Sequence, residues 1–317
     1  MSKEIEERIE KIPVLRRLVH FLKRIKLPWL YELSLYDLLE LYIIGIVEGA
    51  LSYRASAIAF SFFMALFPFA LFILNLIPYI PIEGFQQDFL KFVEHGVPPH
   101  TYDAIASIIN DILNNSHSGL LSWGFVLSIF LMANGLTAIL GGFQTSHHII
   151  IKRGFLHQYF VALAMSLLLS LLLLITVATI LIFEIFIQKI KMHDVLNDNI
   201  PFIQMGRYLF VILMILVTTS ILFRFGTKQT HKPVFITIGS VLTTILIILS
   251  SYFFGIWVIR FSKYNQLYGS IGTLLIMMFY IWINCMILLL GFDLNAAINK
   301  LKNKHKDLKA QILNPNS

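Results

Sequence analysis

The stretch from residue 55 to residue 81, "ASAIAFSFFMALFPFALFILNLIPYIP", decides the fold class of this chain. It contains no charged side chain and exceeds the roughly 20 apolar residues that a helix needs to cross about 30 Å of hydrocarbon. Of the 317 residues in the chain, 57% are hydrophobic and only 14% are charged. This composition is typical of an integral membrane protein and argues against a soluble fold.

Apolar stretches of this kind recur along the chain. Continuous apolarity over such lengths indicates helices, because a membrane β-barrel would show alternating segments of about ten residues. Membrane-spanning helices are therefore predicted at residues 57–79, 120–141, 159–183, 208–225, 234–259 and 267–291. Most of the 25 lysines and arginines lie before the first span, after the second and fourth spans, and in the C-terminal tail. By the positive-inside rule, both termini are expected in the cytoplasm.

The expected organisation has three regions. Residues 1–54 form a cytoplasmic segment, residues 55–298 a membrane domain, and residues 299–317 a basic cytoplasmic tail. Residues 34–49 predict an amphipathic helix at the membrane interface. The external loop at residues 82–118 predicts two more amphipathic helices, which either cap the bundle or dip into the headgroups. The predicted fold class is all-α, a polytopic membrane protein with six transmembrane helices and amphipathic interfacial helices.

Charge and cysteine content argue against several classes of protein. The net charge of +7 does not indicate a nucleic-acid partner, because the basic residues flank apolar spans. The single cysteine, Cys285, has no partner for an internal disulfide. The first forty or so residues carry charges of both signs and lack the features of a secretory signal, so the mature chain is expected to begin near Met1.

Pro68 interrupts the first span near its middle. It cannot donate a hydrogen bond to the carbonyl of Met64, so a kink is predicted there. Because a freed carbonyl in hydrocarbon needs a partner, the kinked face should point inward, where Ser61 or a neighbouring span could reach it. The kink either only shapes the bundle or forms a hinge or the wall of a groove.

Three motifs resemble a known family. The stretches "ASAIAFSFFMALFPFALFIL", "FVEHGVPPH" and above all "YGSIGTLLIMMFYIWINCMILLLGFDLNAAI" are similar to the YihY/BrkB family of bacterial inner-membrane proteins, once mislabelled ribonuclease BN. The likeness extends from about Tyr36 to Ile298. Where the family pattern commonly has glutamate after the last glycine, this chain has Asp293. The resemblance implies a six-span protein of the inner (cytoplasmic) membrane without an established activity.

Two groups of residues are candidates for function. The first, expected at similar cytoplasmic depth, forms an ion-pair cluster that closes the cytoplasmic side, a lipid-headgroup site, or a plain positive-inside anchor. Its members are Arg54, Arg153 and Asp293. The second either lines a groove beside the kinked span or makes ordinary contacts between helices. Its members are Ser61, Pro68, Asn75, Asn134 and Asn284.

Metal and catalytic sites are not predicted. His147, His148 and His157 do not fall on one helix face, and no nearby cysteine or carboxylate completes a ligand set. The chain shows no metal cluster motif, no phosphate-binding loop and no Ser/His/Asp context. We therefore expect no cofactor, no metal and no enzymatic activity.

Two functions remain open at this stage. The leading hypothesis is a membrane protein that binds or translocates an amphipathic, anionic, lipid-like substrate beside the kinked first span. The alternative is a scaffold or regulator that recruits envelope partners through its external helices. The expected partners are membrane lipids in the first case and envelope proteins in the second, and the sequence does not set the oligomeric state.

Overall fold

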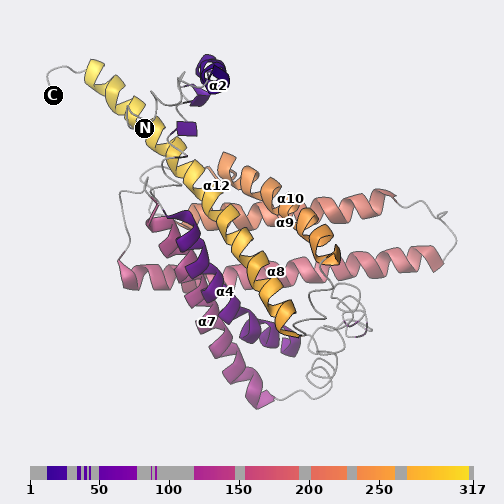
Figure 1. Ribbon diagram of the computed structural model, residues 1–317. Helices are drawn as coiled ribbons and strands as arrows, with labels where there is room; N and C mark the ends of the chain where they lie inside the picture. The colour runs from indigo at the N-terminus through magenta and orange to yellow at the C-terminus, as the bar shows by residue number, and fades with distance from the viewer. Residues whose placement is uncertain are drawn as a thin grey trace.

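The structure is a computed structural model in which the described residues fall almost entirely in helices (Figure 1). It describes residues 13–26, 34–36, 39–40, 43, 50–76, 87, 90, 118–146, 154–192, 201–226, 234–260 and 270–313. The helices are α2 (Pro13–Arg24), α4 (Leu51–Leu76), α7 (Ser118–Gln144), α8 (Phe155–Met192), α9 (Pro201–Gly226), α10 (Ile238–Arg260) and α12 (Ser270–Leu313). Within these ranges, β structure is limited to an isolated bridge between Lys26 and Ser34.

Each predicted span overlaps one long helix, in the order α4, α7, α8, α9, α10 and α12. Among the described residues, α8, α9, α10 and α12 are long and apolar enough to cross a membrane. Within α4 and α7, the apolar stretches whose side chains are described are shorter, at Leu51–Leu66 and Ile129–Gln144. The fold is therefore all-helical with several membrane-spanning candidates, as predicted, whereas the count of six is not settled by these segments.

The long helices form a closed ring of neighbours. In chain order, α4 packs on α7, α7 on α8, α8 on α9, α9 on α10, and α10 on α12, and α12 returns to α4. Figure 1 shows α8 and α9 running side by side, with α4, α7 and α12 crossing them at an angle. Direct contacts of α7 with α9 and with α12 fill the middle of the ring.

The core lies at one end of this ring, which we call the Arg54 end. The buried apolar side chains come from residues 51–65 of α4, 133–143 of α7, 162–165 of α8, 221–223 of α9 and 281–298 of α12. Among the described side chains of α8, α9 and α10 beyond this zone, at residues 167–180, 205–218 and 245–258, none is buried. Among the described side chains, packing is thus concentrated at the Arg54 end, and the opposite halves of α8, α9 and α10 expose apolar side chains such as Leu171, Leu209 and Phe253.

Successive helices run in opposite directions through the Arg54 end. Arg54 lies in the first turn of α4 and contacts Gly142 near the end of α7. Gln158, near the start of α8, donates to the carbonyl of Thr137 on α7 at 3.1 Å. Near the end of α9, a side chain at Gly226 would meet the ring of Phe143. Helix starts and helix ends therefore alternate at this end, as expected for a chain that crosses a layer back and forth.

Helix α4 continues through Pro68, and Figure 1 shows its axis bending in the second half, which contains this proline. The side chains at 67–76 lie outside the description. The hydroxyl of Ser61 donates to the carbonyl of Ala57 at 3.0 Å, one turn back. The expectation that Ser61 serves the carbonyl freed by Pro68 is therefore wrong, because its hydrogen is already used within its own turn.

Three other expectations concern the ends of the chain and the loops. The predicted amphipathic helices at residues 34–49 and 82–118 fall mostly outside the described residues. Helix α2 was not predicted from the sequence. Its last turn holds Lys23 and Arg24, and cations are favourable at a helix C-terminus. Helix α12 continues past the expected start of the tail at residue 299 to Leu313, because the segment "NKLKNKHKDLKAQIL" holds no glycine or proline and is rich in helix-forming residues.

Candidate functional site

Arg54 is held on the buried face of α4, in its first turn. Ala50 precedes the helix with a φ of 45°, and its carbonyl accepts a hydrogen bond from the Arg54 N–H at 3.1 Å. The neighbouring residues Ala55 and Ala59 are fully buried. Such small side chains let adjacent helices approach closely, as is common in membrane proteins. The side chain of Arg54 therefore enters the packed core instead of reaching outward from the span end.

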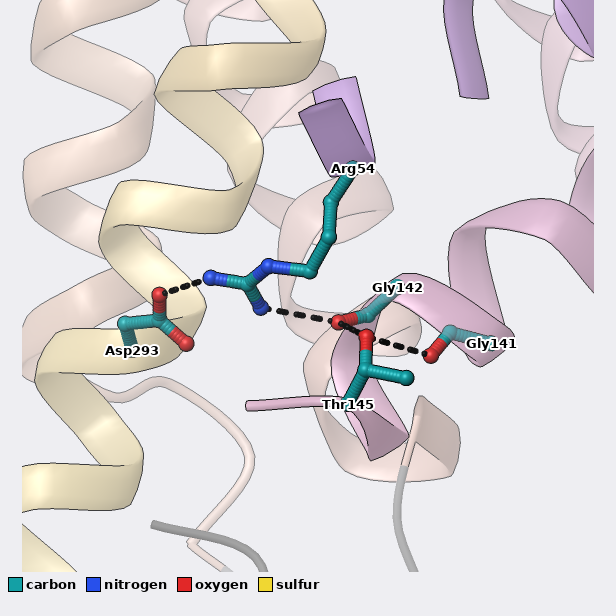
Figure 2. Close-up of polar contacts among 5 residues, drawn as sticks. All are labelled: Arg54, Gly141, Gly142, Thr145 and Asp293. Carbon is teal, nitrogen blue, oxygen red and sulfur yellow. Dashed lines mark hydrogen bonds and ion pairs between the residues drawn. The ribbon is translucent and has the colours of Figure 1, made fainter. Parts of the chain in front are cut away.

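The guanidinium of Arg54 joins three helices (Figure 2). Its Nη2 lies 2.8 Å from Oδ2 of Asp293 on α12, and the two side chains are 6% and 1% exposed. Its Nη1 donates to the carbonyl of Gly142 on α7 at 2.9 Å. An arginine–carboxylate contact this short, shielded from water, is a strong charge-assisted hydrogen bond. The pair thus ties α4, α7 and α12 together at the Arg54 end.

The end of α7 supplies a second source of negative potential for Arg54. The carbonyl of Gly142 also accepts a hydrogen bond from the Thr145 hydroxyl, which lies 3.1 Å away, and this hydroxyl reaches the carbonyl of Gly141 as well (Figure 2). Carbonyls at a helix C-terminus carry the negative end of the helix dipole. A Cβ at position 142 would lie 2.7 Å from Cδ1 of Ile58, so glycine allows α4 to pass this close.

Helix α12 contributes more than Asp293 to this end of the molecule. The preceding residue, Phe292, stacks on Phe143 of α7, with ring centroids 4.0 Å apart. It also meets Phe223 of α9 edge to face at 5.8 Å. These rings belong to the apolar core directly beside the ion pair. They exclude water from it and so raise the strength of the charge interaction.

The flanking residues of the same segment bind α12 to α10. A Cβ at Gly291 would overlap the hydroxyl of Thr243, and a Cβ at Gly239 would overlap the carbonyl of Gly291. Asn295 accepts a hydrogen bond from the Gly239 N–H at 2.8 Å and donates to the Thr237 hydroxyl at 2.7 Å. Segment 291–295, "GFDLN", therefore contacts four different helices within little more than one turn.

The polar groups at the Arg54 end are only partly satisfied. Buried atoms without a hydrogen-bond partner among the described residues include Nε of Arg54, Oδ1 of Asp293, Nε2 of Gln144 and Oγ of Ser146. Buried polar atoms are normally paired, and a group left unpaired calls for a physical reason. The network is therefore held by few bonds and retains both donors and acceptors for other partners.

The structure brings together two of the three residues proposed for the charged site. Arg54 and Asp293 form the ion pair, whereas Arg153 lies outside the described residues. Of the three histidines considered as ligands, only His157 is described, and it is exposed at the start of α8. The contact between Arg54 and Asp293 leaves open whether the pair acts as a gate, a headgroup site or an anchor.

Three of the five residues of the proposed groove, Ser61, Asn134 and Asn284, have described side chains. The side chains of Pro68 and Asn75 lie outside the description. Asn284 donates to the carbonyl of Tyr280 on its own helix at 2.8 Å. Asn134 is exposed on the surface of α7 instead of bonding to a neighbouring helix. The described hydrogen bonds therefore do not include the contact between helices that was one of the two alternatives for Asn134, and Ser61 also bonds within its own helix.

Sequence reasoning missed Asn295 and the paired glycines Gly239 and Gly291 as parts of the site. The signal was present, because Gly291 and Asn295 are four residues apart and so share one helix face. That face is the one packed on α10. A glycine and an amide at this spacing in an apolar helix indicate a close helix crossing with a hydrogen bond across it.

A known protein family matches this chain over most of its length. A family model described as Virulence factor BrkB matches residues 45–312, a range that includes every long helix and both members of the ion pair. The chain belongs to the virulence factor BrkB family. This confirms the resemblance carried by the motifs around Pro68 and Asp293, and it makes the chain a membrane protein of that family.

The individual proteins that resemble this BrkB-family chain are identical to it at about a quarter of the aligned residues. The putative ribonuclease-like protein YfkH of Bacillus subtilis (strain 168) is 26% identical over 254 residues, which cover 78% of this chain and 90% of the relative. A UPF0761 membrane protein of Coxiella burnetii (strain Dugway 5J108-111) is 24% identical over 254 residues, or 77% of this chain and 86% of the relative. No solved structure matches the chain.

Proposed function

We propose that this BrkB-family chain is a non-enzymatic, six-span protein of the inner (cytoplasmic) membrane that binds and translocates an anionic, lipid-like molecule. The Arg54–Asp293 pair is its cytoplasmic gate. The observation that carries the proposal is this buried and incompletely satisfied ion pair, which lies at the end of the ring where the described buried side chains gather.

The span count rests on α4 and α7 as additions to the four long apolar helices. They contain 26 and 27 residues, which gives about 40 Å at 1.5 Å per residue and exceeds the roughly 30 Å of hydrocarbon. The alternating directions at the Arg54 end fit six crossings. The basic segments that favour a cytoplasmic position precede α4, at residues 3–26, and follow α7 and α9, and these are the helix ends that meet at the Arg54 end. Both termini are then cytoplasmic.

A gate needs a bond that is strong when closed and able to open. Burial of two charges carries a desolvation cost that a single short contact offsets only in part. Here one carboxylate oxygen and one guanidinium nitrogen remain unpaired. Water or a ligand reaching these atoms would restore their hydrogen bonds, so separation of the pair relieves an existing deficit.

An anionic headgroup is the ligand that suits this gate. In the closed state Asp293 neutralises Arg54, so the pair is not a standing phosphate site. A phosphate or carboxylate can take the place of Asp293 on the arginine, because the fork of N–H donors binds either group. The exposed apolar side chains of α8, α9 and α10 in the opposite half suit the acyl chains of such a molecule.

The test is lipid movement in vesicles. The purified chain is reconstituted with phosphatidylethanolamine and phosphatidylglycerol plus a trace of fluorescent phosphatidylglycerol, and dithionite then bleaches the label in the outer leaflet only. Wild type should allow bleaching beyond that of protein-free vesicles. Asp293→Asn should speed the movement, because it weakens the closed state and keeps the cation. Arg54→Gln should slow it, because it removes the group that receives the headgroup.

The two variants disrupt the same contact, so opposite effects separate a gate from a structural bond. Ser251→Ala serves as a control, because it removes a 2.7 Å hydrogen bond to Tyr280 between α10 and α12 without touching the gate. Equal changes in the two gate variants, or no protein-dependent bleaching in wild type and Asp293→Asn, would reject the proposal. The scaffold alternative depends on residues 82–118, which lie mostly outside the described structure.

A further inference from the structure

Asn134 is a polar side chain on an outward face of the ring. It is exposed, and no hydrogen bond of its amide is found among the described residues. It lies eight residues before Gly142, whose carbonyl holds Arg54. Eight residues correspond to about 12 Å along a helix axis. If the Arg54 end marks the membrane boundary, the amide is therefore well inside the hydrocarbon layer.

The contacts of α7 show which face carries this amide. Next to it, Gly135 faces α4, since a Cβ there would lie 3.6 Å from Cβ of Ala65. On the side toward α8, the backbone carbonyl of Thr137 accepts the hydrogen bond from Gln158. Asn134 lies on the face between these contacts. Phe130 and Leu127, one and two turns earlier on this side of α7, are 51% and 53% exposed.

An amide that faces lipid is costly, because hydrocarbon offers no hydrogen-bond partner. A lipid at rest in the leaflet is not a lasting partner, because its headgroup stays at the membrane surface, about 12 Å away along the helix axis. A second protein surface can satisfy the amide. The partner must present a donor and an acceptor at the same depth, since the asparagine side chain needs both.

We propose that a second copy of this chain covers the face marked by Leu127, Phe130 and Asn134. Two copies inserted with the same topology are related by a two-fold axis along the membrane normal, which sets α7 beside α7 and places each Asn134 at the depth of the other. The amide is its own complement, so the pair forms two reciprocal hydrogen bonds. This dimer does not depend on the proposed translocation activity.

Cross-linking tests the geometry with Asn134 intact. In a Cys285→Ala background, which removes the only native cysteine, Leu127→Cys is oxidised in native membranes with copper phenanthroline. We expect a covalent dimer of the chain. Leu249→Cys on α10 is the matched control, because its native leucine is 46% exposed on another helix, and it should remain monomeric. A cross-link to a different polypeptide, or equal dimer yields at both positions, would overturn the proposal.

Association in bilayers tests the amide itself. Single-molecule photobleaching at a series of protein-to-lipid ratios gives the dimer fraction of wild type, Asn134→Leu and Asn134→Gln. Leucine should lower the association constant by about 3- to 20-fold, the range set by interhelical polar contacts in membranes. Glutamine keeps a donor and an acceptor and should retain most of the association. Dimerisation unchanged in Asn134→Leu, or a wild type that is monomeric at every ratio, would contradict the inference. If Asn134→Leu fails to fold, the Leu127→Cys result decides alone.

Discussion

Replacing one partner of the Arg54–Asp293 pair should destabilise the protein far more than replacing both. In Asp293→Leu or Arg54→Met, a charge remains in a site where the native side chains are 1% and 6% exposed. Leaving one charge of a buried pair without its partner costs about 3–5 kcal/mol. The Arg54 change also removes the donor to the Gly142 carbonyl, 2.9 Å away, so its cost should lie at the upper end of that range.

The double variant removes both charges and fills the site with apolar groups of similar volume. Such replacements of buried pairs are often neutral or stabilising, so the double variant should unfold within about 1 kcal/mol of wild type after the loss of the Gly142 hydrogen bond is included. The coupling energy between the two positions should then have a magnitude of about 5 kcal/mol or more, because each single variant loses at least about 3 kcal/mol and the double variant at most about 1.

Thermal unfolding in detergent, followed by the fluorescence of the four tryptophans, measures this cycle. At about 2 °C per kcal/mol for a chain of this size, each single variant should lower the midpoint by roughly 6–10 °C and the double variant by only a few degrees. Single variants within about 1 kcal/mol of wild type, combined with additive effects in the double variant, would show that the ion pair does not hold the Arg54 end together.

Two further predictions concern the crossing of α10 and α12. Gly291→Ala should destabilise the fold by about 2 kcal/mol or more, because the new methyl overlaps the Thr243 hydroxyl. The control is Gly255→Ala, where no atom lies within 4 Å of the added Cβ. In melts followed by circular dichroism, this control should be neutral or slightly stabilising. Asn295→Leu should cost about 1–2 kcal/mol in the same melts, because the Gly239 N–H at the start of α10 loses its acceptor, whereas Asn295→Asp keeps an acceptor and should cost less. A Gly291→Ala midpoint equal to that of Gly255→Ala, or equal losses for the two Asn295 variants, would contradict these assignments.

The positions of the long helices followed from the sequence because a membrane span needs a continuous apolar run, and such runs are visible without any partner. The approach of Arg54 to Asp293, 239 residues apart in the chain, was one of the alternatives that the sequence left open. Charges are excluded from the hydrocarbon centre, so residues at span ends on one side share a similar depth. The expected depth of a charged residue in the membrane therefore limits which other charged residues it can pair with, even where the spacing of apolar residues does not show which helix faces meet.

The faces of the helices did not follow from the sequence. In a soluble helix, polar residues mark the solvent side, but in a membrane both the lipid-facing side and the core-facing side are apolar. Nothing in the residues around Asn134 therefore distinguished a buried amide from an exposed one. The same reasoning explains why the glycines at 239 and 291 were missed, since a close crossing depends on which residues of two helices meet.

The contacts at the Arg54 end also indicate which parts would separate when the proposed gate opens. Helices α10 and α12 are in backbone contact at Gly239 and Gly291 and are further held by Asn295. Helices α4 and α7 approach closely at Gly135 and Gly142. These backbone contacts allow little sliding without overlap, so each pair of helices should move as one unit.

Arg54 is part of the unit formed by α4 and α7, because it lies on α4 and donates a hydrogen bond to the carbonyl of Gly142 on α7. Asp293 belongs to the α10–α12 unit. Between the units, the polar contacts within the described residues are the ion pair and the hydrogen bond from Trp282 Nε1 to Ser56 Oγ at 3.1 Å. Opening would therefore break the two polar side-chain bonds and part the stacked rings of Phe292 and Phe143, while the backbone contacts within each unit survive. Because side-chain bonds between intact units can form and break repeatedly without unfolding a helix, this division of contacts is the arrangement that a reversible gate requires.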